Sequence, residues 1–301
     1  ETRGLDWFNP DQQAFLASWA DADGEYVADL SKPDEVRLFL DALESADILV
    51  CHNLSFDVHQ VRATLGWDAL KCRAELHDTD LMSRVLFPEG QRKGRGGHGL
   101  KNLATIHLSP DGDVAEQKLI DACEDAGIKL KTTGGYYKAW RAFPALLEHY
   151  AAMDARYTYD LFVKFEEMMT VDQARTYALE QAVAPVLITA EARGTALDPS
   201  AVDRLRSEYQ GQATATHARL ADTLGEEAIG GEGSEAALVE ALQKQGVPLW
   251  EKTPSWQLAT NKFALQEFID DHPCIEDLFA WRTATKFLST YLDPLVGRDV
   301  V

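Results

Sequence analysis

The chain has 301 residues, of which 46% are hydrophobic, and a formal net charge of −20. This length favours two domains with buried cores, at about 100–200 residues per domain. No apolar run reaches the roughly 18 residues of a membrane-spanning helix, and no basic-then-apolar leader supports secretion. The acidic balance argues against a general nucleic-acid binder, because phosphates repel acidic surfaces.

The cysteines are widely spaced and form no C-x-x-C pair, at Cys51, Cys72, Cys123 and Cys274. This spacing predicts free thiols in a reducing cytoplasm, and neither a zinc site nor a disulfide framework. The first five residues are typical of the end of a strand and a turn. We therefore expect the strand itself to precede Glu1 in a longer polypeptide.

The first elements in chain order predict an α/β domain. Two β-runs, residues 14–20 and 25–30, flank a polar turn that contains Gly24 and predict a hairpin. A helix, a buried strand and a second helix are predicted next, over 33–46 (with Ser31 as the cap), 47–51 and 56–65. Antiparallel strands followed by alternating helix and strand favour a mixed sheet.

Helical periodicity dominates the rest of the sequence. A Gly-rich basic loop at 90–99 and a second Gly-rich break at 132–135 interrupt it. The predicted helices cover 100–108, 114–126, 145–169, 172–193, 199–224, 234–245, 261–271 and 275–292. Because the composition becomes almost wholly helical after residue 172, we place a domain boundary near 170, giving domains 1–170 and 171–301.

Three short motifs carry candidate chemistry. Tyr150 and Asp154 lie at positions i and i+4 of a predicted helix, so both project from one face. A carboxylate suits Mg²⁺ or Mn²⁺, and a neighbouring phenol can orient a metal-bound water. Asn53 and Asp57 follow a predicted strand, where open α/β sheets place functional residues. Taken alone, these residues are more typical of a surface Asp, a half-buried Tyr, a capping Asn and a first-turn Asp.

Taken together, the motifs resemble a known family. The order E-T-x-G-L at 1–5, H-N-x-x-F-D at 52–57 and Y-x-x-x-D at 150–154 is similar to the three exonuclease motifs of the DEDDy 3′→5′ exonucleases. Asp78-Thr79, which opens a further predicted helix, and the segment at 99–104 resemble linking segments of that family. The resemblance implies a ribonuclease H-like fold, with a mixed sheet flanked by helices, over residues 1–170.

The second half resembles the family A, DNA polymerase I type, DNA polymerases. The matching segments are 180–197, which is similar to the start of the polymerase region, 252–261, and the R-x-x-x-K…T-Y pattern at 281–292, which is similar to the end of a thumb. The resemblance implies an all-helical thumb-type segment over 171–301. The palm and fingers, with the polymerase carboxylates, are not present in these residues, so this piece is not expected to polymerise.

The resemblance also implies a two-metal site that hydrolyses DNA 3′ ends with Mg²⁺ or Mn²⁺. By family analogy Glu1, Asp57 and Asp154 hold metal, Tyr150 orients the water, Thr2 and Leu5 contact the terminal nucleotide, and Asn53 supports the site. The first Asp of the family's Asp-x-Glu motif would lie two residues before Glu1, outside this sequence.

Basic residues are the candidates for contact with DNA. Single-stranded 3′ ends could be guided by Arg92, Lys93 and Arg95, and duplex phosphates by Arg282 and Lys286. A solvated loop and ordinary surface charges fit the same residues.

Two other functions fit the motifs. One is a ribonuclease D-like exoribonuclease, and the other is a non-catalytic DNA-binding scaffold with a degenerate nuclease site. The leading prediction is the proofreading part of a family A DNA polymerase, in the cytoplasm of a bacterium or a phage-infected host, without a membrane partner.

Overall fold

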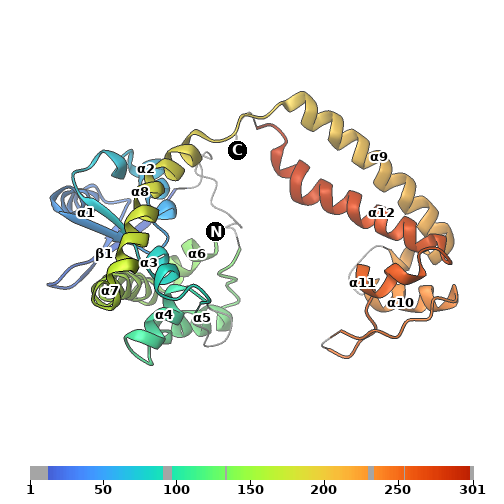
Figure 1. Cartoon of the computed structure of the whole chain (residues 1–301), viewed down its shortest axis with the longest axis horizontal. Helices are drawn as coiled ribbons and strands as arrows, with labels where there is room; N and C mark the ends of the chain where they lie inside the picture. Colours follow the sequence, from blue (N-terminus) through green and yellow to red (C-terminus); the bar gives the residue numbers. More distant parts are fainter. Residues whose placement is uncertain (1–12, 91–96, 133, 230–233, 254, 299–301) are drawn as a thin grey trace. The chain divides into compact units, whose positions relative to one another are not determined.

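The computed structural model describes residues 13–90, 97–132, 134–229, 234–253 and 255–298. Contacts divide the chain into two compact units, Glu1–Arg193 and Gly194–Val301, which Figure 1 draws in blue to yellow-green and in ochre to red. The first unit combines helices with short strands, and the second is helical. The architecture is therefore α/β and rich in helix, as the sequence predicts.

The strands of the first unit form two pairs. β1 (Leu16–Ala20) runs antiparallel to β2 (Glu25–Asp29), which confirms the predicted hairpin. β3 (Ile48–Cys51) runs parallel to β4 (Glu75–Asp78). The described residues therefore contain two two-stranded sheets, where the sequence predicted one mixed sheet.

The helices of the first unit follow the predicted order, with one addition. Their bounds are α1 (Pro33–Ser45), α2 (Leu54–Leu65), α3 (Thr79–Leu86), α4 (Leu100–His107), α5 (Val114–Asp125), α6 (Gly135–Ala142), α7 (Pro144–Met168) and α8 (Val171–Arg193). The added helix is α6. Its segment was predicted to be a Gly-rich break, but Gly134 takes a left-handed φ of 70° and starts the helix.

The predicted cap of α1 is wrong. Lys32 is the N-cap residue, with no side-chain cap hydrogen bond, and Pro33 is at the first helical position. The Ser31 hydroxyl instead donates to Asp29 Oδ1 at 2.7 Å. Pro33 has no N–H to be satisfied and its fixed φ suits a first turn, so the helix begins without a serine cap.

The long helix α7 is the centre of the first unit. It packs against α3, α4, α5, α6 and β1. Leu161 and Phe165, four residues apart on one face, are fully buried with Leu103 of α4. Burial of these side chains fixes the position of α7 and of its two candidate site residues.

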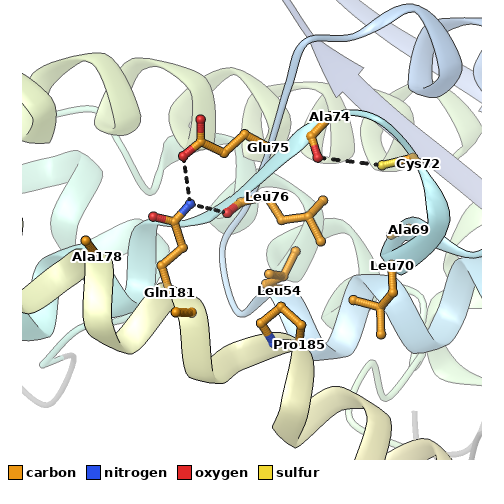
Figure 2. Close-up of a pocket in the computed structure, with 11 residues that line it drawn as sticks. Leu54, Ala69, Leu70, Cys72, Ala74, Glu75, Leu76, Ala178, Gln181 and Pro185 are labelled. Carbon is orange, nitrogen blue, oxygen red and sulfur yellow. Dashed lines mark hydrogen bonds between the residues drawn. The ribbon is translucent and has the colours of Figure 1, made fainter.

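Helix α8 packs on β4 within the first unit, partly through polar contacts. The Tyr177 hydroxyl lies 3.0 Å from His77 Nδ1, and Gln181 Nε2 donates to the Leu76 carbonyl at 2.8 Å. Figure 2 shows Gln181 among the mostly apolar residues that line a pocket between α8 and the segment from Ala69 to Leu76. By contacts, residues 171–193 belong to the first unit. The predicted domain boundary near residue 170 stays a prediction.

The second unit is a helical bundle in its described residues. Its α-helices are α9 (Pro199–Leu224), α10 (Ser234–Lys244), α11 (Lys262–Leu265) and α12 (Pro273–Phe287), and a π-helix continues over residues 288–292. The long helices α9 and α12 pack side by side (Figure 1). Leu220, Leu242 and Ile275 are fully buried in its core. Across the described part of the chain, no helix is long and apolar enough to span a membrane, and all four cysteines are free, as predicted.

Candidate active site

A large cleft in the first unit brings the candidate residues together. It has a volume of about 1600 Å³. Strands β1 and β3 and helices α2, α6 and α7 line it, and its walls include Asp57, Tyr150 and Asp154. Two motifs that are far apart in the sequence, at 52–57 and 150–154, therefore place side chains in one cavity.

Asp57 is positioned by the turn between β3 and α2. Asn53 takes a left-handed φ of 74° and precedes the first residue of the helix, Leu54. The carboxylate of Asp78, at the end of β4, accepts the backbone N–H groups of Asn53 and Leu54 at 3.0 and 2.9 Å. The parallel pairing of β3 with β4 thus sets the first turn of α2, which carries Asp57.

The environment of Asp57 disfavours its charge. Burial raises the pKa of Asp57 to about 7, hydrogen bonding with Cys51 opposes this effect, and the negative charge of Asp78 adds to it. Burial also raises the pKa of the Cys51 thiol well above its ordinary value. A charged Asp57 is therefore energetically costly in this environment.

Tyr150 and Asp154 occupy one face of α7, as the i, i+4 spacing predicts. The Tyr150 ring stacks on Tyr136 of α6, with 6.4 Å between ring centroids. Trp140 of the same helix stacks on Phe15 at 5.2 Å. The unpredicted helix α6 therefore supplies aromatic side chains next to the candidate site.

Lys101 is a site residue to which the sequence assigned no role. It lies on α4 and forms an ion pair with Asp154 Oδ1. Burial lowers the pKa of Lys101 to about 8, against the opposing effect of the Glu116 carboxylate. Its segment, at 99–104, was recognised only as a linking segment. Spacing gave no signal, because α4 and α7 meet only in the folded chain.

The other predicted site residues fall into two groups. Six lie outside the described residues, and these are Glu1, Thr2, Leu5, Arg92, Lys93 and Arg95. Asn53 is described and exposed, and it does not line the cleft. Its supporting role stays a prediction.

In the second unit, Arg282 and Lys286 differ in their surroundings. The Arg282 guanidinium donates to the Thr260 carbonyl and, at 3.2 Å, to the Thr260 hydroxyl. Burial lowers the pKa of Arg282. Lys286 is exposed. Contact of either residue with DNA stays a prediction.

The donor set suits a hard divalent cation but is incomplete in the described residues. Asp57 and Asp154 supply carboxylate oxygens on the walls of one cleft. Among the residues that the structure describes, no group of three or more His, Cys, Asp or Glu side chains could hold a metal ion. Glu1, a further predicted ligand, lies outside that part of the chain.

Comparison with known proteins identifies similar chains. Residues 1–170 match the family model of the 3′-5′ exonuclease of DNA polymerase A. The DNA polymerase of Mycobacterium phage L5 is 21% identical over 278 residues, covering 90% of this chain and 45% of the relative. DNA polymerase I of Rhizobium leguminosarum is 31% identical over 232 residues, covering 73% of this chain and 20% of the relative.

A solved structure shares the fold. It is described as the POL domain of Pol1 from M. smegmatis in complex with DNA primer-template and dNTP. Its TM-score is 0.56 at 21% identity, and the match covers 94% of this chain and 44% of that chain. The chain spans less than half the length of these relatives.

Proposed function

Because this chain belongs to the 3′-5′ exonuclease family of DNA polymerase A, we propose that its first unit is the proofreading exonuclease of a larger polymerase, which removes nucleotides from DNA 3′ ends. One observation carries the proposal. Asp57, Tyr150 and Asp154, which come from two separate motifs, line one cleft. Burial also raises the pKa of Asp57 to about 7, and strongly shifted carboxyl groups are more common at functional sites than in decayed scaffolds.

We further propose that the two strand pairs belong to one ribonuclease H-like mixed sheet. Every residue of β1 and β3 lines the cleft. β2 pairs with β1, and β4 pairs with β3. β1 and β3 therefore face the same cleft, as two parts of one sheet would.

The chain's own residues have distinct tasks in the proposed hydrolysis. Asp57, Asp154 and Glu1 would hold two divalent ions, Mg²⁺ or Mn²⁺. When bound, such ions supply a hydroxide nucleophile at neutral pH and stabilise the leaving oxygen. The Tyr150 hydroxyl orients the attacking water. Its ring is held for this task by the stack on Tyr136.

The proposed DNA path continues from the cleft. Thr2 and Leu5 contact the terminal nucleotide, Asn53 supports the site, and Arg92, Lys93 and Arg95 guide the single strand. In the second unit, a thumb-type segment contacts duplex phosphates. Lys286 is exposed and suited to this contact, whereas the hydrogen bonds of Arg282 to Thr260 give that residue a structural task as well.

The two alternative functions receive less support. The similar proteins that cover most of this chain are DNA polymerases of phages and bacteria, which favours DNA ends over a ribonuclease D-like substrate. The same relatives favour a bacterial or phage-infected cytoplasm as its place of action.

The proposal is tested with the full-length protein and a labelled single-stranded DNA. We expect 3′→5′ degradation in Mg²⁺ or Mn²⁺ and none in EDTA. Asp154→Ala should lower the rate by at least about 100-fold, Tyr150→Phe should slow it while Mn²⁺ still binds, and the exposed-site control Asp125→Ala should match wild type. Inactivity of the wild type in both metals, or full activity of Asp154→Ala, would contradict the assignment.

A further inference from the structure

The contact between Lys101 and Asp154 places a cation inside the proposed metal site. Lys101 Nζ pairs with Asp154 Oδ1, and the two side chains are 17% and 28% exposed. Leu103 and Ala104, which follow on the same helix, are fully buried. The backbone of α4 is therefore fixed, and Lys101 reaches α7 from an anchored helix.

The ammonium group also lies over two aromatic rings of α7. Lys101 Nζ is 4.5 Å from the centroid of the Tyr150 ring and 5.5 Å from that of Tyr157. Tyr150, Asp154 and Tyr157 occupy positions i, i+4 and i+7, so they form one face of the helix. Since ring faces attract cations at these distances, the ammonium keeps favourable partners if Asp154 turns to another cation.

We propose that Lys101 is a positioning residue that holds the Asp154 carboxylate in the metal-free protein and competes with the divalent ion for it. This inference rests on the proposed function, because it assumes that Asp154 is a metal ligand. An unpaired carboxylate in a half-buried site is unfavourable, and a fixed ammonium group removes much of that cost. The same ammonium must leave Asp154 Oδ1 before that oxygen can bind a metal.

Competition of this kind lowers metal affinity by a calculable factor. The apparent dissociation constant is the intrinsic one divided by the fraction of molecules whose carboxylate is free. If Lys101 occupies Asp154 in nine molecules of ten, the metal binds roughly tenfold more weakly than it would to a free site. Lys101 would thus hold the site in shape and limit metal binding at low concentration.

The test compares Lys101→Met with wild type in the full-length protein, using Mn²⁺ and isothermal titration calorimetry. Met keeps the length of the side chain and removes its charge. We expect a roughly tenfold lower Kd for Mn²⁺ in Lys101→Met, and a lower Tm in EDTA. Lys101→Arg, which keeps the charge, should bind Mn²⁺ more like wild type. Lys118→Met, at an exposed lysine of α5, should change neither quantity.

A double-mutant cycle gives a second readout. Thermal unfolding in EDTA is measured for Lys101→Met, Asp154→Asn and the double variant. Non-additivity is expected, because each single change removes the same ion pair. Additive effects would overturn the proposal, and they can be measured even if the Met variant is too unstable for calorimetry.

The outcomes separate this inference from the proposed function. If wild type binds Mn²⁺ through Asp154 and degrades 3′ ends, an unchanged or weaker Mn²⁺ affinity in folded Lys101→Met refutes only the role of Lys101. If wild type neither binds Mn²⁺ nor degrades DNA, both proposals fall together. Tighter binding in Lys101→Met but not in Lys118→Met supports the competition.

Discussion

Both carboxylate oxygens of Asp78 are bonded to the turn that begins at Asn53. Oδ1 accepts the N–H of Asn53 at 3.0 Å, and Oδ2 accepts that of Leu54 at 2.9 Å. Oδ1 also accepts the N–H of Asp80 at 2.9 Å and so caps α3. One side chain at the end of β4 therefore fixes the starts of two helices, including the helix that carries Asp57.

Asp78→Ala should lower the free energy of unfolding by about 2–4 kcal/mol, because it leaves three backbone N–H groups without their charged acceptor. Asp78→Asn keeps one carbonyl acceptor and should cost less. Urea denaturation measures both, and Asp41→Ala, at an exposed site of α1, should stay within about 0.5 kcal/mol of wild type. A similarly small change in Asp78→Ala would mean that the turn is held by other contacts.

Asp57→Asn should stabilise the metal-free protein in a pH-dependent way. The folded pKa of about 7 lies above the ordinary value of 3.8, so between these values the folded state binds more protons than the unfolded state. The contribution of Asp57 to the free energy of unfolding therefore falls as pH rises from about 4 to about 7. In EDTA, the free energy of unfolding of Asp57→Asn should exceed that of wild type by on the order of 1–4 kcal/mol at about pH 8, and the two should be equal near pH 4.

The measurement is urea denaturation at several pH values, with Asp125→Asn as the exposed control. A gain of equal size at every pH would show that the effect is packing or hydrogen bonding and not the charge of Asp57.

Tyr177→Phe should weaken the attachment of α8 to the first unit. The Tyr177 hydroxyl contacts His77 Nδ1 at 3.0 Å and accepts the N–H of Asp78 at 3.2 Å. Burial raises the pKa of Tyr177 to about 12, so the group is a neutral hydroxyl at all ordinary pH values. Its removal leaves buried polar groups unpaired and should cost roughly 1–2 kcal/mol in thermal unfolding. Tyr137→Phe, at an exposed tyrosine, should cost nothing measurable.

Gly135→Ala and Gly211→Ala should have opposite effects on stability. A Cβ at Gly135 would lie 2.3 Å from the Leu130 carbonyl oxygen and 2.4 Å from that of Lys129. The backbone would have to move, at a cost of about 1–3 kcal/mol, and α6 would shift its aromatic side chains at the cleft. Gly211 lies inside α9 with open space around it, so alanine should add about 0.5–1 kcal/mol. Differential scanning calorimetry gives both signs in one experiment.

Periodicity and turn chemistry were sufficient to predict the hairpin, β3 and the long helices, because those elements depend on residues close together in sequence. β4 was missed. Its four residues, Glu75 to Asp78, are mostly polar, and only pairing with β3 makes them a strand. α6 was missed because two glycines resemble a break, although Gly134 has the left-handed conformation that starts the helix.

The candidate site divides in the same way. The sequence by itself determined that Tyr150 and Asp154 share a helical face and that Asp57 follows a strand, since both are consequences of local geometry. Only the tertiary structure decided that all three face one cleft, that burial raises the pKa of Asp57, and that Lys101 pairs with Asp154. Desolvation and ion pairing depend on atoms from distant segments, and those atoms meet only after α4 and α7 have packed.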